Sequence, residues 1–247
     1  MIEQVQAQLL VLQEVGSLAT LECLNEQLAN PYPFASLVPG NSTRSIHIGV
    51  LSRYPCQLTS HRQLPLTQTD GSVLLQLEQE GGQPQPARLQ RDIVQITTGY
   101  GDLALTLFAV HLKSRINQAW QIVDAQTIRA AEVTALCSLV EALKVTQPEQ
   151  AVVVLGDFND QPDAALLQPL EGLGLIDLHG QAAAARGFNP TTYWPKRHCR
   201  FDRILLNSVA ADLFVPDSAM MHGSRMAQQA SDHYPVSLVL KVAGPDS

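Results

Sequence analysis

Apolar residues in this chain gather into short runs, separated by polar loops. Residues 151–155 form a continuous, largely β-branched run, which is typical of a strand buried on both faces of a sheet. Similar patterns predict strands at residues 9–12, 46–52, 73–78, 91–97, 103–111, 201–206 and 236–242. The strands at 91–97 and 103–111 are expected to form a hairpin around the turn at 99–101.

Two longer segments have apolar residues at helical spacing. Residues 17–30 predict one helix, which Asn30 and Pro31 would end. Residues 120–145 predict the longest helix of the chain. A third pattern begins at Ile2 and leads into the strand 9–12, with Glu14 at its exit. Many strands and few long helices in mixed order, with no internal repeat or linker, predict two packed sheets with helices outside.

Composition fits one large globular domain. The chain has 247 residues, of which 45% are hydrophobic and 16% are charged. Its formal net charge of −7 argues against a general electrostatic attraction to nucleic acid. The charge does not exclude an enzyme acting on nucleic acid whose bound cations offset it locally.

The four cysteines and the N-terminal segment suggest no special compartment. Cys23, Cys56, Cys137 and Cys199 are far apart and lack metal-binding spacing, so we expect free thiols. The first residues lack a basic segment followed by an apolar run, and no apolar stretch is long enough to span a membrane. The sequence as it stands predicts a cytoplasmic protein, and a signal peptide upstream of Met1 would instead predict secretion.

Polar residues with catalytic potential lie at, or close to, the ends of five predicted strands. They are Glu14, His111, Asp157, Asn159, Asp202, Asp232 and His233. Strand ends on one rim of a sheet sandwich converge, and carboxylates gathered there would repel one another without a cation. Oxygen ligands suit Mg²⁺ or Mn²⁺ and argue against structural zinc. A histidine beside an aspartate is a general acid–base arrangement, so the set predicts phosphate-ester hydrolysis.

Each residue alone has a plainer interpretation. Glu14 could be a surface carboxylate, and His111 a histidine of the core or of a loop. Asp157 could cap the loop that follows it, and Asp202 could form a salt bridge with Arg203. The whole set is harder to explain in these ways.

Residues 191–198 form a basic and aromatic loop. Tyr193 and Trp194 could stack on a nucleotide base, while Arg197 contacts a phosphate. A solvated loop with a packed Trp194 is the alternative. We keep the three side chains as candidate substrate-binding residues.

Five short motifs give the chain a resemblance to the endonuclease/exonuclease/phosphatase superfamily, the DNase I-like proteins. They are Leu12-Gln13-Glu14-Val15, His111-Leu112-Lys113-Ser114, Gly156-Asp157-Phe158-Asn159, Phe201-Asp202-Arg203-Ile204-Leu205 and Ser231-Asp232-His233-Tyr234-Pro235. They occur in the family's order and extend over nearly the whole chain. The resemblance implies a four-layer α/β/β/α sandwich of two mostly antiparallel or mixed sheets, with the active site at one end.

The resemblance also implies roles. Glu14 resembles the principal metal ligand, and Asp232 a second metal or supporting carboxylate, for Mg²⁺ or Mn²⁺. Asn159 resembles a contact to phosphate and water. The implied catalytic residues are His111, Asp157, Asn159, Asp202 and His233.

The beginning of the chain departs from the family pattern. The family opens with a strand that ends in an asparagine, and no asparagine precedes Glu14. We therefore expect a single domain over residues 1–247 that lacks its first strand. A misplaced start, a truncated chain and a genuine variant are the three explanations, and the first two are favoured. Such a form is expected to bind metal weakly.

The predicted function is divalent-metal-dependent hydrolysis of phosphate esters, and a nuclease-type phosphodiesterase is favoured. One alternative is an enzyme acting on a small phosphate ester, such as a phosphoinositide, a nucleotide or a phospholipid headgroup. Another is a non-catalytic binding protein on the same fold. No stable protein partner is indicated.

Overall fold

The larger sheet carries three of the predicted site residues, His111, Asp157 and Asp202. In the computed structural model, which describes residues 2–77, 80–101, 103–185, 190–192 and 199–241, the strand order of this sheet is β10-β9-β8-β7-β4. The strands are β4 (Cys56–Ser60), β7 (Ile93–Tyr100), β8 (Leu103–His111), β9 (Ala151–Asp157) and β10 (Asp202–Leu206). β8 and β9 run parallel, while the other neighbours are antiparallel. The parallel pair requires a crossover, which contains helix α3 (Ala125–Thr146).

A smaller antiparallel sheet has the order β1-β3-β2. Its strands are β1 (Leu9–Val15), β2 (Phe34–Val38) and β3 (His47–Ser52). Two short ribbons pair β5 (Leu75–Gln76) with β6 (Gln85–Pro86), and β11 (Met220–Met221) with β12 (Val236–Ser237).

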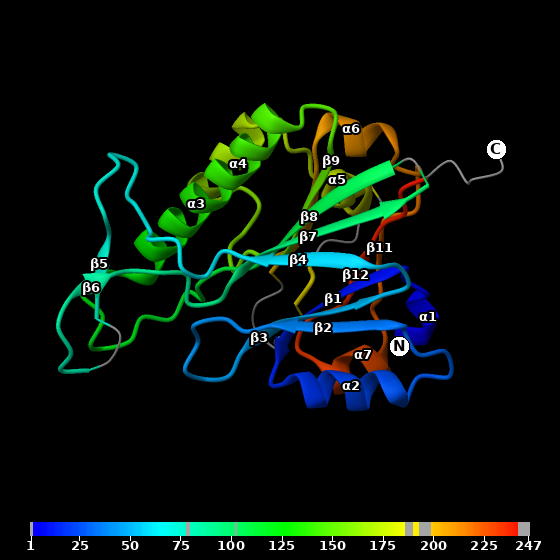
Figure 1. Ribbon diagram of the computed structural model, residues 1–247, viewed down its shortest axis with the longest axis horizontal. Coiled ribbons are helices and arrows are strands. Elements are labelled where there is room, and N and C mark those ends of the chain that lie inside the picture. The colour runs from blue at the N-terminus through cyan, green and yellow to red at the C-terminus, as the bar shows by residue number, and fades with distance from the viewer. Residues whose placement is uncertain (1, 78–79, 102, 186–189, 193–198, 242–247) are drawn as a thin grey trace.

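Helices lie on the outer sides of these sheets (Figure 1). α3 and α4 (Gln168–Gly172) lie beyond the larger sheet, whereas α2 (Leu18–Glu26) and α7 (Arg225–Ala230) lie beyond the smaller one. The remaining helical segments are α1 (Ile2–Val5), η1 (Ala165–Leu167), α5 (Leu178–Ala185) and α6 (Ser208–Asp212). The fold is therefore mixed α/β with several sheets.

Three apolar clusters hold the elements together. One joins the inner faces of both sheets and includes Val50 and Val153. A second joins the outer face of the larger sheet to α3 and includes Val154 and Leu136. A third places Leu21 of α2 against the smaller sheet. Neighbouring residues of β9 thus enter different clusters, as the continuous apolar run predicts.

Most expected elements are present, with some different bounds. The helix expected at 120–145 begins later, because Asp124 caps its first turn by accepting from the Thr127 amide. The helix expected at 17–30 ends at Glu26. The strands expected at 73–78 and 236–242 were overestimated, since regular pairing there covers two residues each. β2 and β4 were not predicted.

The expected states of the cysteines are confirmed, and the surface charge is uneven. All four cysteines are free thiols.

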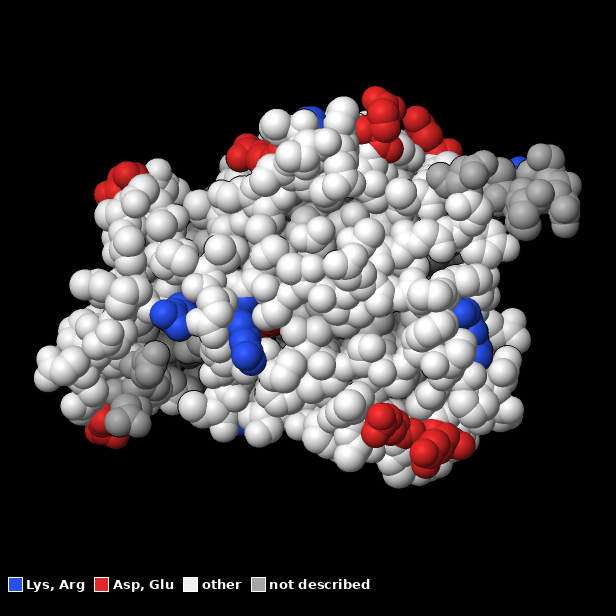
Figure 2. Space-filling model, viewed as in Figure 1, with Lys and Arg blue, Asp and Glu red and all other residues white. Residues whose placement is uncertain are grey.

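No described helix has the length and hydrophobicity needed to cross a membrane. Figure 2 shows acidic side chains in separate groups around the edge of one face, and basic side chains in separate groups rather than in one continuous patch.

Candidate functional site

Three predicted residues are neighbours across the ends of adjacent strands. Asp157 of β9 is paired in register with His111 of β8 on one side and with Asp202 of β10 on the other. Residues in register on neighbouring strands place their side chains on the same face of a sheet. Strand pairing alone therefore sets the carboxylate of Asp157 between His111 and Asp202.

The contacts of Asp157 fix its carboxylate on both oxygens. His111 Nε2 lies 3.3 Å from Asp157 Oδ2, and both side chains are buried. Asn159 donates its backbone N–H to Asp157 Oδ1 at 2.7 Å and its side-chain amide to Oδ2 at 3.0 Å. The same amide donates to the carbonyl of Leu112 at 2.9 Å. A φ of 52° at Asn159, in the left-handed region that asparagine tolerates, makes this turn.

His233 and Asp202 form a second pair. His233 Nδ1 lies 2.7 Å from Asp202 Oδ2, so Nδ1 donates and Nε2 is left facing away from the carboxylate. Thr191 holds the beginning of β10, because its hydroxyl accepts the backbone N–H groups of Phe201 and Asp202 at 3.0 Å each. Its carbonyl accepts the N–H of Tyr234, next to His233, at 2.7 Å.

Burial and neighbouring groups shift the pKa values of Asp157, Asp202 and His233. Burial raises the pKa of Asp157, but the hydrogen bond and charge of His111, the charge of His233 and the Asn159 amide outweigh it and leave this pKa below its usual value. Burial raises the pKa of Asp202, against the pull of His233. Burial lowers the pKa of His233, but Asp202 and Asp157 reverse this and raise it to about 9. At neutral pH the site therefore holds an ionised Asp157 and a protonated His233.

The raised pKa of His233 predicts a pH-dependent stability. Its ordinary pKa is 6.5 and its folded-state pKa is about 9, so the stabilisation is complete below pH 6.5 and is lost as the pH rises through 9. The free energy of unfolding should fall by about 3 kcal/mol across this window. Urea denaturation from pH 6 to pH 10, with EDTA present, measures it.

The Asp202→Asn variant is the control for this prediction. It removes the carboxylate that stabilises the imidazolium, so most of the fall in stability between pH 6.5 and pH 9 should disappear. Equal pH dependence in the two proteins would contradict the assignment.

Glu14 lies within an irregularity of β1 rather than at a strand exit. The pairing of β1 with β3 shifts between Leu12 and Val15, and Glu14 has a φ of 57°. A bulge of this kind redirects a side chain, and strained backbone clusters at functional positions. The Glu14 side chain is 57% exposed and one oxygen lies 4.0 Å from His111 Nε2.

The predicted metal ligands are not brought together by any contact among the described residues. Asp232 is exposed, and its charge acts on His233. No group of three or more His, Cys, Asp or Glu residues within the described ranges could hold a metal ion by itself. Glu14 nevertheless presents an accessible carboxylate beside the buried pair of His111 and Asp157, which suits Mg²⁺, an ion held by one or two carboxylates, water and substrate phosphate.

The candidate substrate-binding loop is not described. Tyr193, Trp194 and Arg197 lie outside the residues that the structure describes, and their predicted role stays a prediction.

Sequence reasoning missed several polar residues around the site. Arg115 ion-pairs with Asp160 and donates Nε to the Asn159 carbonyl at 3.2 Å. Its guanidinium lies 5.0 Å from the ring centre of Phe201. Both residues had the same local signal, because Asp160 directly follows the motif Gly156-Asp157-Phe158-Asn159 and Arg115 directly follows His111-Leu112-Lys113-Ser114.

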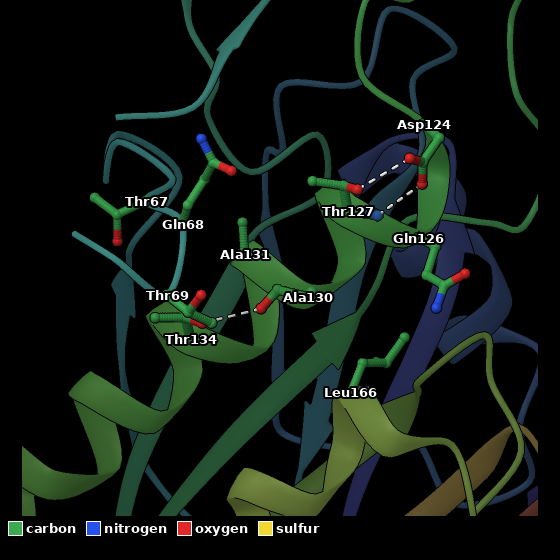
Figure 3. Close-up of a pocket in the computed structure, with 10 residues that line it drawn as sticks. All are labelled: Thr67, Gln68, Thr69, Asp124, Gln126, Thr127, Ala130, Ala131, Thr134 and Leu166. Atoms are coloured by element: carbon green, nitrogen blue, oxygen red, sulfur yellow. Dashed lines mark hydrogen bonds between the residues drawn. The ribbon is translucent and has the colours of Figure 1, made fainter. Parts of the chain in front are cut away.

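A separate pocket of about 290 Å³ opens near the beginning of α3 (Figure 3). Its lining includes Asp124, Thr127 and Thr134. The Asp124 oxygens accept from the amide and hydroxyl of Thr127, and Thr134 donates to the Ala130 carbonyl at 3.1 Å. These polar groups are thus used in hydrogen bonds within α3 and its cap. The lining contains none of the predicted site residues.

The chain matches the profile of the Endonuclease/Exonuclease/phosphatase family over residues 1–233 and belongs to this family. No curated protein matches it. Among solved structures, it is similar to D. rerio TDP2 complexed with a single-strand DNA product, with a TM-score of 0.63 and 18% identity over 96% of this chain and 87% of that one.

Two other structures show the same fold. The 3′ phosphatase NExo from Neisseria, bound to a product DNA hairpin, has a TM-score of 0.61 and 16% identity, covering 98% of this chain and 91% of that one. The human Nocturnin catalytic domain with a bound sulfate anion has a TM-score of 0.64 and 14% identity, covering 96% and 83%. At these identities the likeness establishes the fold.

Proposed function

We propose that this protein is a divalent-metal-dependent phosphoesterase of the nuclease type, built as a single four-layer α/β/β/α sandwich. The observation that carries the proposal is the in-register row of His111, Asp157 and Asp202, completed by the contact between His233 and Asp202. Together with the neighbouring Asn159, this row supplies an ionised carboxylate, a protonated imidazole and an orienting amide. Family membership supports the reaction class.

Asp157 is proposed to orient the attacking water and to receive its proton. Its carboxylate is ionised, and Asn159 fixes both oxygens, so little reorganisation is needed when the water is bound. The side-chain carbonyl of Asn159 is a further acceptor for the same water. His111 stabilises the charge on Asp157 from the side opposite to Asp202.

His233 is proposed to act as an acid or charge stabiliser rather than as a base. Its Nδ1 is held by Asp202, and the raised pKa keeps the ring protonated at neutral pH. Nε2–H can therefore donate to a phosphoryl oxygen or to the leaving group as negative charge develops.

Glu14 and Asp232 are the proposed ligands for Mg²⁺ or Mn²⁺. The fit rests on Glu14, whose redirected carboxylate is accessible beside His111, which itself contacts Asp157. When bound, such an ion would supply Lewis-acid polarisation of the phosphoryl oxygen.

Nucleic acid is the favoured substrate, because two proteins with this fold are solved with product DNA. Tyr193, Trp194 and Arg197 are the proposed contacts to a base and its phosphate. A small phosphate ester is the second candidate, favoured by the net charge of −7 and by the absence of a continuous basic surface among the described residues of the face in Figure 2.

A substrate panel tests the reaction class. The panel consists of p-nitrophenyl phosphate, bis-p-nitrophenyl phosphate, single- and double-stranded DNA, and RNA, each with Mg²⁺, Mn²⁺ or EDTA. Metal-dependent cleavage of a diester or of DNA supports the nuclease proposal, and cleavage of the monoester alone supports the small-ester alternative. No turnover on any member would contradict both and favour a binding protein.

The His233→Ala variant tests the site. It should lower kcat about a hundredfold or more, because the donor to the leaving group is lost. His222→Ala is the matched control, since His222 contacts Ser237 and lies outside the proposed site. A near-normal rate for His233→Ala would remove His233 from the chemistry.

A further inference from the structure

Two charged side chains of α3, Arg129 and Glu132, point into the protein. Arg129 is 3% exposed and Glu132 is 1% exposed. Residues three apart on a helix share one face. Full burial of Arg or Glu is rare unless the group is paired, so their partners matter.

At the end of β8, these side chains hold the peptide groups that directly follow His111. Glu132 Oε2 accepts the backbone N–H of Lys113 at 2.6 Å. Arg129 Nη1 donates to the Lys113 carbonyl at 3.1 Å. One residue earlier, Arg91 Nη1 donates to the Leu112 carbonyl at 2.9 Å. Three buried ionisable side chains thus hold consecutive backbone groups beside His111.

At the end of β9, the same helix reaches the other half of the site. Arg129 donates Nε and Nη2 to Asp160 Oδ2 at 3.2 and 2.9 Å. Asp160 directly follows Asn159, whose side-chain amide donates to the Leu112 carbonyl. The Leu112 N–H in turn donates to the Asp157 carbonyl at 2.9 Å. One face of α3 therefore fixes the ends of β8 and β9 relative to each other.

Stability alone gives no reason for this arrangement. Burying charged groups in pairs rarely gains free energy over a packed apolar set. Glu132 Oε1 is buried without a hydrogen-bond partner in the described part of the chain. Burial raises the pKa of Glu132 to about 7, against the Lys113 amide hydrogen bond and the charges of Arg91 and Arg129. What the contacts do supply is a fixed geometry at His111 and Asp157.

We propose, on the basis of the function proposed above, that Glu132 and Arg129 are positioning residues that hold the strand ends bearing His111 and Asp157 in catalytic alignment. They act through the backbone of Lys113 and through Asp160, and they do not touch the substrate. A small displacement of reacting groups can lower a rate by about a hundredfold, so the effect should be measurable.

The test compares Glu132→Met with Glu132→Gln. Methionine keeps the length of the side chain but cannot accept the Lys113 N–H, whereas glutamine retains an acceptor oxygen. Glu132→Met should lower kcat about ten- to a hundredfold with little change in KM. Glu132→Gln should recover most of the wild-type kcat.

Leu136→Ala, one turn further along α3, is the control for general destabilisation. Leu136 is fully buried in the apolar cluster, so its truncation should lower the melting temperature and leave kcat unchanged in the folded protein. Unchanged kcat in folded Glu132→Met, or an equal loss in Leu136→Ala, would overturn the proposal.

A readout without turnover separates this proposal from the proposed function. In NMR spectra, Glu132→Met should shift the His111 ring and Asn159 side-chain amide signals and speed hydrogen exchange at the Lys113 amide. Leu136→Ala should leave these signals in place. If the wild-type protein hydrolyses nothing, the proposed function fails, and these signals still decide whether Glu132 fixes the strand ends.

Discussion

Asp157→Asn is expected to lower kcat for phosphodiester hydrolysis by about a thousandfold. The amide has the shape of the carboxylate but carries no charge and cannot accept a proton from water. It also removes the anion that lies 3.3 Å from His111 Nε2 and helps to raise the pKa of His233. Steady-state kinetics on bis-p-nitrophenyl phosphate and on a DNA oligonucleotide, with Mg²⁺ or Mn²⁺, measure the loss. KM should change little, because the lost interaction is with the attacking water.

Asp177→Asn is the matched control for this variant. Asp177 is also a mostly buried, ion-paired carboxylate, with Arg200 Nη2 at 2.7 Å and Arg203 Nε at 3.1 Å. Its loss should reduce stability without changing kcat in the folded protein. Asp157→Asn activity within about tenfold of wild type would exclude Asp157 from proton transfer, since general-base catalysis contributes more than this.

Sequence patterns predicted the contents of the site better than its construction. His111, Asp157 and Asp202 were identified because each borders an apolar run, which is a local signal. Their placement side by side depends on β9 pairing with both β8 and β10, and pairing between distant segments has no local signature. The expectation that these strand ends meet came from the general geometry of a sheet sandwich, which gives neither the strand order nor the register.

Other features could not be predicted from the sequence, because tertiary contacts determine them. Glu14 was expected at a strand exit, but a bulge with positive φ keeps it within β1. β4 was missed because Cys56–Ser60 contains one large aliphatic residue and gains its strand structure by pairing with β7. Glu132 and Arg129 occupy the buried face of a correctly predicted helix, where the spacing rule anticipates apolar residues.

Gly156 shows how closely the backbone beneath the site is packed. Its φ is 136°, a conformation that residues with a Cβ rarely adopt. A Cβ at this position would lie 1.9 Å from the carbonyl oxygen of Val110, its partner in register on β8. That oxygen also accepts from Gln13 Nε2 at 3.2 Å, so it is held from the side of β1 as well.

Gly156→Ala should therefore destabilise the protein by about 3–5 kcal/mol, as backbone strain and overpacking act together. The clash is with backbone, so it can be relieved only by separating β8 from β9, which also separates His111 from Asp157. The fraction that remains folded should accordingly lose activity as well as stability. Denaturant unfolding and kcat per folded molecule measure the two effects.

Variants of two other glycines separate the cost of backbone strain from the cost of steric overlap. Gly174 has a φ of 81°, and a Cβ added there would meet no atom within 4 Å, so Gly174→Ala reports backbone strain alone, about 1 kcal/mol. Gly172 also has open space around it but lacks a positive φ, so Gly172→Ala should be neutral or slightly stabilising. The excess of Gly156→Ala over Gly174→Ala is the steric part. If that excess is absent, β8 and β9 can separate without penalty, and the row of His111, Asp157 and Asp202 is less rigid than the register of the sheet indicates.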